Sequence, residues 1–382
     1  PGSDRRHRNG ASIPKGEQMN PLAELGELGQ SVWYDYITRD LLVSGELKRL
    51  IEQDGLRGMT SNPTIFEKAV SASRLYDDDI RQLADQGKSA AEVFEALAVA
   101  DVRLACDAFL PLYHSSSGSD GLVSIEVSPA LAHDEDATVR EAERLWSGVS
   151  RANAMIKIPA TRAGLGAVTR CIGQGINVNV TLLFSVTRYA EVIEAFLTGL
   201  EQRRQQQLPV DKIASVASFF VSRVDTKIDP LLDRSGAGDK LRGKAAIANA
   251  CEAYRLFEER LRSPRWKSLA HAGARPQRPL WASTSTKDPR YPDTYYVEAL
   301  IAPQTVNTLP PETLVAYRDH GRPEVRIYQG MARSAKQLEE LAGAGIDLAQ
   351  VTRELEDEGV EKFAASHRSV LATIDTKIGL LV

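Results

Sequence analysis

The chain has 382 residues, 43% hydrophobic and 26% charged, so it is long enough for one large domain or two ordinary ones. This composition is typical of a folded globular protein and excludes a fibrous or mainly disordered chain. Lys and Arg total 47 against 51 acidic residues, and the net charge of -4 excludes a general attraction to nucleic acid or to an anionic membrane.

The opening segment, residues 1–18, mixes arginines with Gly and Pro and lacks the apolar core of a secretion signal. We expect it to be a tag remnant or a disordered leader. No run of about 18 apolar residues follows, so we expect no membrane span and a cytoplasmic location. Cys106, Cys171 and Cys251 lie far apart without a CxxC pair or a zinc spacing, and we interpret them as reduced core residues.

Short apolar or β-branched runs alternate with longer stretches of helical period along the chain, which is the pattern of βα units around a parallel sheet. Eight such runs are candidate strands, and eight parallel strands close a barrel. In chain order they are VWYDYI (32–37), LRGMTSN (56–62), LVSIEV (122–127), AMIKIP (154–159), INVNVTLL (176–183), IASVASFFV (213–221), PLWASTS (279–285) and QTVNTLP (304–310).

Helices are predicted between these runs, among them 89–113, 186–203 and 244–262. The first opens with Ser89 and Glu92 in the spacing of a capping box. The apolar stripe expected on this helix consists of Val93, Leu97, Ala100, Leu104 and Ala108.

No linker rich in Gly, Ser or Pro divides the predicted strands, so we expect residues 19–382 to form a single domain. Its predicted fold class is α/β, a TIM (β/α)8 barrel. Residues 330–382 are charge-rich with regularly spaced apolar anchors, and they predict a helical C-terminal extension.

Lys157 is the most informative polar residue, because it interrupts the apolar strand AMIKIP. Burial there disfavours the charged ammonium, and a neutral amine can attack a carbonyl to form a Schiff base. The alternative is a lysine at the edge of a strand whose ammonium reaches water. The residues alone leave both interpretations open.

Carboxylates interrupt two other predicted strands, at Asp35 and Glu126, and general acid or base catalysis would need such groups. Alternatively, each carboxylate pairs with a buried basic group. Uncharged side chains that would suit a polyhydroxylated ligand are Asn62, Asn179, Thr181 and Ser218. Asn62 precedes a proline, which is also typical of a helix cap.

A basic group follows the sixth predicted strand, where Arg223 has the planar geometry that suits a phosphate. An ion pair with Asp225 is the alternative. Ser283, Ser285 and Lys287 follow the seventh strand, the region where barrels often bind phosphate. The histidines show no metal-ligand spacing and no full nucleotide-binding motif is present, so we expect neither a metal nor a cofactor.

Four blocks of the sequence resemble motifs of the transaldolases, specifically their longer bacterial form, in the correct order. The likeness extends from about residue 22 to the run LEDEGVEKF (355–363). The blocks are TSNPTIF (60–66), MIKIPATRAG (155–164), GINVNVTLLFS (175–185) and SFFVSRVD (218–225).

The resemblance implies a transferase of the pentose phosphate pathway that needs no cofactor. It would move a dihydroxyacetone unit from sedoheptulose 7-phosphate to glyceraldehyde 3-phosphate, giving erythrose 4-phosphate and fructose 6-phosphate. By matching positions, Lys157 would form the Schiff base and Asp35 would take the proton that accompanies carbon–carbon cleavage. Glu126 would act through a water held with Thr181.

The remaining implied residues bind substrate. Many family members carry an arginine where this chain has Ser285, so Lys287 is the expected substitute in the phosphate grip. The residues that would hold the donor or its phosphate are Asn62, Asn179, Ser218, Phe220, Arg223, Ser283 and Lys287.

Two other functions remain open from the sequence. One is an aldolase like the fructose-6-phosphate aldolases, which release free dihydroxyacetone and typically carry Gln and Tyr where this chain has Glu126 and Phe220. The other is a barrel without catalysis that only binds sugar phosphates. The sequence also leaves a monomer and a homodimer open.

Overall fold

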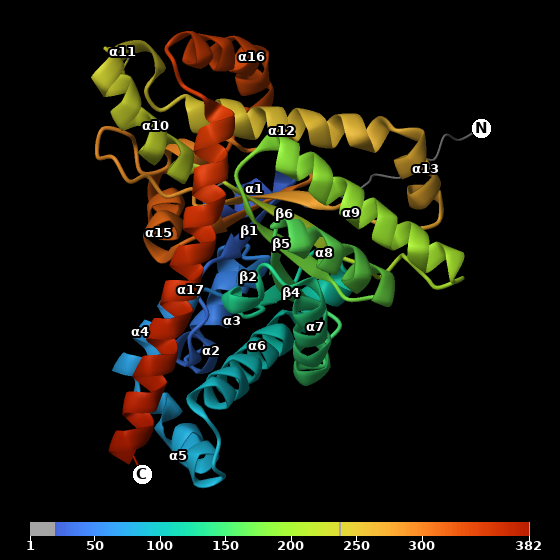
Figure 1. Cartoon of the computed structure of the whole chain (residues 1–382), viewed down its shortest axis with the longest axis vertical. Coiled ribbons are helices and arrows are strands. Elements are labelled where there is room, and N and C mark those ends of the chain that lie inside the picture. Colours follow the sequence, from blue (N-terminus) through green and yellow to red (C-terminus); the bar gives the residue numbers. More distant parts are fainter. Residues whose placement is uncertain (1–19, 237, 382) are drawn as a thin grey trace, which may run out of the picture.

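The computed structural model describes residues 20–236 and 238–381. The expected leader, residues 1–18, lies outside this part of the chain. The described residues contain a closed barrel of eight parallel strands in sequential order, surrounded by helices (Figure 1). The strands are β1 (Gln30–Tyr34), β2 (Gly58–Thr60), β3 (Leu122–Glu126), β4 (Ala154–Pro159), β5 (Val178–Leu183), β6 (Ser215–Phe220), β7 (Arg278–Ala282) and β8 (Thr305–Leu309).

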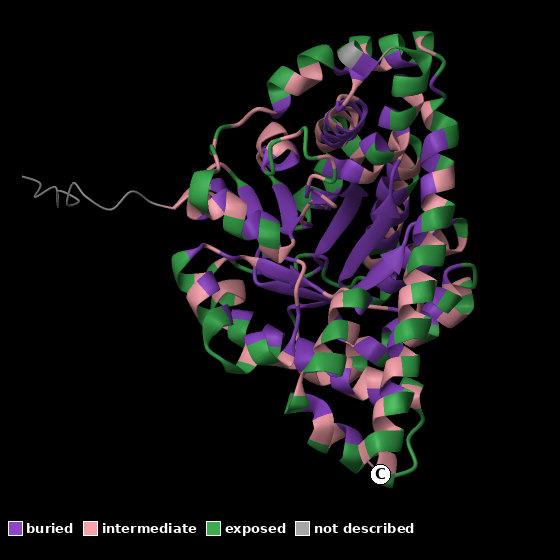
Figure 2. Cartoon of the chain, turned by 90° about the vertical axis from the view of Figure 1, so that its left-hand side faces the viewer, coloured by how far each residue is buried: buried purple, intermediate pink, exposed green. Residues whose placement is uncertain are grey.

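Helices follow the strands and cover the barrel from outside, so the strands form its buried centre (Figure 2). The α-helices are α1 (Pro21–Glu27), α2 (Arg39–Val43), α3 (Glu46–Gln53), α4 (Pro63–Ala72), α5 (Asp77–Asp85), α6 (Ala90–Ser115), α7 (Glu135–Val149), α8 (Arg162–Gln174), α9 (Val186–Gln205), α10 (Ser222–Ser235), α11 (Gly238–Leu241), α12 (Ala245–Arg262), α13 (Pro264–His271), α14 (Tyr295–Ala299), α15 (Pro311–His320), α16 (Ile327–Gly343) and α17 (Leu348–Leu381). Two short 3-10 helices are η1 (Arg74–Tyr76) and η2 (Pro129–Leu131).

The predicted fold class, a TIM (β/α)8 barrel with additional C-terminal helices, is confirmed. Each predicted run overlaps one strand, but the ends differ. β1 ends at Tyr34, so Asp35 follows the strand instead of lying within it. β2 has only three residues, and its Gly58 packs against Trp33, where an added Cβ would come within 2.5 Å of the indole. A glycine is therefore needed for this large side chain to enter the barrel.

The capping box at the start of α6 is confirmed, because the Ser89 hydroxyl and the Glu92 side chain each bond the other's backbone N–H. The predicted apolar stripe of α6 is correct only at its beginning. Val93 and Leu97 are buried, whereas Leu104 is 43% exposed and Phe109 takes a buried position instead. The buried face shifts because the two halves of this helix pack against different cores.

A small second core explains that shift. Val93 and Leu97 pack with residues of α4, α5 and the C-terminal helix, whereas Phe109 belongs to the main barrel core. The buried members of the second core are Phe66, Val70, Tyr76, Ile80, Val93, Leu97, Val370 and Ile374. Helix α17 therefore holds α4, α5 and α6 together at one side of the barrel.

Helix α17 runs across the barrel opening, in front of the strand ends (Figure 1). It contacts β5 and α10 with its first half and α4, α5 and α6 with its second half. The predicted helical extension is thus present as α16 and α17. Within residues 20–236 and 238–381, no helix has both the length and the apolar character needed to cross a membrane.

Candidate active site

Parallel strands of a closed barrel all end at the same opening, so side chains at their carboxyl ends converge. The polar residues selected from the sequence occupy these positions. They are Asp35 after β1, Asn62 after β2, Glu126 ending β3, Lys157 in β4, Asn179 and Thr181 in β5, Ser218 in β6, Arg223 after β6, and Ser283 after β7.

Lys157 and Glu126 are neighbours across the β3–β4 ladder and point into the opening together. The Lys157 Nζ lies 3.4 Å from Glu126 Oε2, and both side chains are only 8% exposed. The ammonium also donates a hydrogen bond to the backbone carbonyl of Ser61, at 3.3 Å. The interpretation of Lys157 as a lysine that reaches bulk water is therefore wrong.

Glu126 has the electrostatics of a group that can take up and return a proton. Burial raises the pKa of Glu126, the Lys157 ammonium opposes this effect, and the negative charge of Asp35 adds to it. Its Oε2 pairs with the Lys157 ammonium at 3.4 Å and has no other polar partner among the described residues. A carboxyl with a raised pKa beside the reactive amine suits general acid and base work.

Asp35 is fixed by two neighbours from the next strand. Its carboxylate accepts a hydrogen bond from Thr60 Oγ1 at 2.9 Å and one from Asn62 Nδ2 at 3.1 Å. Asn62 also caps α4, because its Oδ1 accepts from the backbone N–H of Thr64. The helix-cap interpretation of Asn62 is thus confirmed, and the same side chain also positions Asp35.

A line of uncharged groups crosses the floor of the opening. Asn179 Nδ2 donates to Ser124 Oγ at 3.0 Å, and Ser218 Oγ donates to Asn179 Oδ1 at 2.7 Å. Thr181 is buried, and its hydroxyl has no partner among the described residues. The register of β5 against β6 shifts beside it, where Leu182 adopts a φ of 61°. Such irregularities turn side chains toward functional sites.

Arg223 lies at the start of α10, over the ring of Phe220 at 5.0 Å. Burial lowers the pKa of Arg223, and the charges of Asp35 and Glu358 oppose this effect. The alternative ion pair with Asp225 is wrong, because Asp225 is buried and accepts instead from the backbone N–H of Ala246 and from a tyrosine hydroxyl. Within the described residues, Arg223 forms no salt bridge, so it can receive an anion.

The two other expected phosphate groups differ in placement. Ser283 Oγ lies 3.0 Å from the hydroxyl of Ser222, which directly precedes Arg223. Lys287 donates to Ser285 Oγ at 2.8 Å and lines a second pocket, which does not include Arg223. The Ser283 hydroxyl thus lies beside the residue that precedes Arg223, whereas the Lys287 side chain lines a pocket to which Arg223 does not contribute.

Comparison with known proteins decides the family. Residues 32–374 match the family model described as Transaldolase/Fructose-6-phosphate aldolase. The chain belongs to this family. A protein named transaldolase from Acidothermus cellulolyticus is 51% identical over 93% of this chain and 96% of its own length. Transaldolase from Frankia alni is 49% identical over 94% and 98%, and transaldolase 2 from Nostoc is 46% identical over 95% and 99%.

The resemblance to transaldolases stated from the motifs is therefore confirmed, and the match extends from within β1 through β8 to most of α17. Sequence reasoning missed other residues of this transaldolase-family opening. Ser124 is the polar residue two positions before Glu126, on the same side of β3. This alternation could have revealed it. Thr60 and Thr308, whose hydroxyls lie 3.1 Å apart, gave no such signal.

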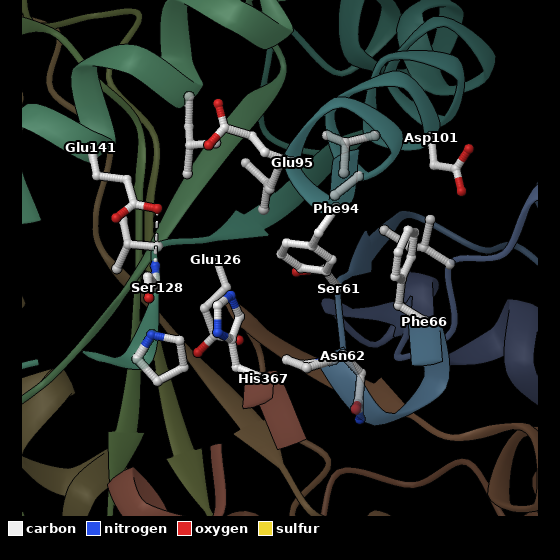
Figure 3. A pocket seen from close by; sticks show the side chains of 18 of the residues that line it. Ser61, Asn62, Phe66, Phe94, Glu95, Asp101, Glu126, Ser128, Glu141 and His367 are labelled. Atoms are coloured by element: carbon white, nitrogen blue, oxygen red, sulfur yellow. Dashed lines mark hydrogen bonds between the residues drawn. The ribbon is translucent and has the colours of Figure 1, made fainter. Parts of the chain in front are cut away.

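A cavity of about 180 Å³ adjoins Glu126, and residues of β3, α6 and α7 are among those that line it (Figure 3). Ser61 and Asn62 line it together with the rings of Phe66, Phe94 and His367. His367 from α17 meets Phe94 edge-on, with ring centroids 5.2 Å apart, and burial lowers its pKa. The sequence assigned no chemistry to the histidines, and this ring serves as an apolar wall.

Proposed function

We propose that this protein is a transaldolase in which Lys157 forms the Schiff base. The enzyme transfers a dihydroxyacetone unit from sedoheptulose 7-phosphate to glyceraldehyde 3-phosphate in the pentose phosphate pathway. The observation that carries the residue assignment is the buried pair of Lys157 Nζ and Glu126 Oε2, 3.4 Å apart at the barrel opening. The family match and relatives named transaldolase support the activity.

The reaction starts when the neutral amine of Lys157 attacks the ketone carbon of the donor. Loss of water gives an iminium ion, and Glu126 moves the protons that this exchange requires. We assign the water through which Glu126 acts to the hydroxyl of Thr181, because this hydroxyl is buried and has no partner among the described residues. Burial raises the pKa of Glu126, which suits a group that both gives and takes protons.

Cleavage follows from the iminium. Asp35 removes the proton from the donor hydroxyl at the bond to be broken, and the electrons of that carbon–carbon bond flow into the iminium. An aldehyde leaves, and the dihydroxyacetone unit stays on Lys157 as an enamine. The bonds from Thr60 and Asn62 hold the Asp35 carboxylate in one orientation for this step. Addition to the acceptor aldehyde reverses the sequence.

Substrate binding uses the neutral and basic groups at the opening. The chain Ser124–Asn179–Ser218 offers amide and hydroxyl groups to the donor's hydroxyls. Arg223 binds the phosphate with help from Ser283, because its guanidinium is not engaged by a carboxylate among the described residues. Phe220 supports the Arg223 guanidinium with the face of its ring. Lys287 lines a separate pocket without Arg223, so we do not assign it to this phosphate.

The proposal extends to the organisation of the chain. We assign residues 19–382 to a single domain, because one continuous core includes residues from Leu22 to Leu355. We place the protein in the cytoplasm, where its cysteines, Cys106, Cys171 and Cys251, are kept as the buried free thiols that the structure has. Sugar phosphates are its proposed partners.

An assay with fructose 6-phosphate separates the transferase from the two alternatives. With erythrose 4-phosphate added, we expect formation of sedoheptulose 7-phosphate and glyceraldehyde 3-phosphate; without it, we expect little free dihydroxyacetone. Abundant release without an acceptor would instead establish an aldolase. Binding of the sugar phosphate without either reaction would establish a barrel that only binds.

A further inference from the structure

An aromatic ring from the C-terminal helix lies over the reactive amine. The Phe363 ring centroid is 5.3 Å from Lys157 Nζ, a distance at which a cation and an aromatic face attract each other. Phe363 is half-buried, and Lys157 beneath it is 8% exposed. The strands surround the amine from below, so this ring belongs to its cover on the solvent side.

The backbone of α17 reaches this position because of a glycine one turn before Phe363. An added Cβ at Gly359 would lie 3.1 Å from the Leu182 side chain, a tight contact, and 3.5 Å from the Phe184 ring. Leu182 directly follows Thr181 in β5. The glycine thus lets α17 pack closely on β5, one turn before the ring.

Charged pairs hold the helix on both sides of the ring. Before it, Glu354 lies 2.7 Å from Lys227 of α10, and Glu356 lies 3.2 Å from Arg188 of α9. Beyond it, Lys377 lies 2.7 Å from Asp77 of α5. Because the helix is fixed at both ends, the position of the ring is defined by the fold.

We propose that Phe363 is a specificity-determining residue that keeps water from the dihydroxyacetone unit bound to Lys157, so that the unit passes to an aldehyde acceptor instead of being released. This inference rests on the proposed transaldolase function. It assigns the choice between transfer and release to a residue of the C-terminal helix, in addition to the polar groups on the strands.

The chemistry of release shows why water matters. The enamine carbon takes a proton from solvent and becomes an iminium ion. Water then adds to the iminium carbon, a proton returns to solvent, and the carbon–nitrogen bond breaks, leaving free dihydroxyacetone and the Lys157 amine. In transfer, the same enamine carbon attacks an aldehyde carbon and the new alkoxide takes a proton. Water then hydrolyses the product iminium, which frees the ketose and the Lys157 amine. Both routes need this hydrolysis, but only release needs a solvent proton on the enamine carbon, so keeping solvent from that carbon slows release relative to transfer.

The face of the ring also suits the charge of the intermediate. The iminium on Lys157 carries the positive charge that the ammonium carries in the free enzyme, so the same ring face stabilises both. Leucine in place of Phe363 keeps an apolar cover and removes this electrostatic contribution. Alanine removes both, and this difference separates the two roles of the ring.

The test measures a ratio, which does not depend on how much of a variant is folded. For each variant, release of free dihydroxyacetone from fructose 6-phosphate alone is divided by transfer with erythrose 4-phosphate. We expect Phe363→Ala to raise this ratio by about tenfold, equivalent to ~1.4 kcal/mol in relative barrier heights. Phe363→Leu should leave the ratio near that of the wild type.

The matched control is Val370→Ala, which shortens a buried side chain of the same helix in the second core, away from Lys157. We expect its ratio to stay at the wild-type value. An unchanged ratio in Phe363→Ala, or an equal rise in Val370→Ala, would overturn the role of the ring. A wild type without transfer would refute the proposed function itself, so the two failures are distinguishable.

Discussion

The two ends of the barrel differ in how completely their charged and polar side chains are paired. At the end where the strands begin, the Asp120 carboxylate forms ion pairs with Arg278 at 3.3 Å and Arg57 at 3.1 Å. It also accepts a hydrogen bond from the hydroxyl of Ser31 at 2.6 Å. At the end where they finish, Glu126 pairs only with Lys157, 3.4 Å away, and within the described residues Arg223 forms no salt bridge and the Thr181 hydroxyl has no hydrogen-bond partner.

This difference separates stability from function. Buried charges that are paired and hydrogen-bonded hold the strands in register, whereas polar groups left open at the other end are available to a ligand. If this division holds, a substitution at the end where the strands begin, the closed end, should change stability. A substitution at the end where they finish, the open end, should change the reaction. Variants at both ends can break this rule.

The largest effect is expected at Lys157. Lys157→Arg keeps a positive charge beside Glu126, but a guanidinium stays protonated and cannot form an imine. We expect the rate of transfer to fall by about a thousandfold or more, which is ~4 kcal/mol of transition-state free energy. The melting temperature should change little. Steady-state kinetics and a thermal melt check both statements, and substantial residual turnover would remove Lys157 from the chemistry.

The next effect concerns the closed end. Asp120→Asn removes the buried carboxylate that pairs with Arg278 and Arg57, and breaking such a pair costs about 3 kcal/mol of unfolding free energy. Urea unfolding measures this loss. The kcat/KM of the folded enzyme should equal that of the wild type. A stable variant with impaired kinetics would contradict the division between the two ends.

Arg223→Ala tests the binding of the substrate phosphate. A hydrogen bond to a charged group contributes about 1.5–3 kcal/mol, so we expect KM for the phosphorylated donor to rise by roughly tenfold to a hundredfold with a smaller change in kcat. Arg162→Ala, an exposed arginine at the start of α8, serves as the control and should leave KM unchanged. Equal KM values in all three proteins would place the phosphate elsewhere.

A smaller effect is expected from Asp225, which lies on the same helix as Arg223 but is buried. Burial raises the pKa of Asp225 to about 7 in the folded protein. Between its ordinary pKa near 4 and pH 7, the folded state therefore binds more protons than the unfolded state, and stability falls as the pH rises. This carboxyl contributes a slope of up to about 1.4 kcal/mol per pH unit.

Asp225→Asn should flatten the dependence of the unfolding free energy on pH in this window, since an amide does not titrate. Chemical denaturation at several pH values between 4 and 8 provides the measurement. The variant keeps the acceptor for the Ala246 N–H but loses the one for the Tyr296 hydroxyl, so the comparison uses the slope with pH and not the absolute stability. Parallel curves for the wild type and the variant would show that Asp225 titrates alike in both states.

The sequence predicts the barrel well because its signals are local. Each strand is a short apolar run, and the start of α6 is encoded in Ser89 and Glu92 within one turn. Its buried face was predicted wrongly after Leu97, because a distant segment, α17, creates a second core that shifts the pattern. Local periodicity carries no information about that partner.

The same distinction holds for the site. Lys157 stands out because a charge interrupts an apolar strand, and the parallel register then places Glu126 beside it. Phe363 and His367 cannot be recognised in this way, since a ring on the buried face of an amphipathic helix normally belongs to the hydrophobic core. Their positions depend on how α17 crosses the opening, which is a property of the whole fold.

Reductive trapping tests the central assignment most directly. The enzyme is treated with borohydride in the presence of fructose 6-phosphate, digested, and analysed by mass spectrometry, with Lys157→Arg as the control. We predict that the wild-type peptide containing Lys157 gains the mass of a reduced sugar adduct and that the control gains none. An unmodified Lys157 peptide, or an adduct on another lysine, would contradict the account.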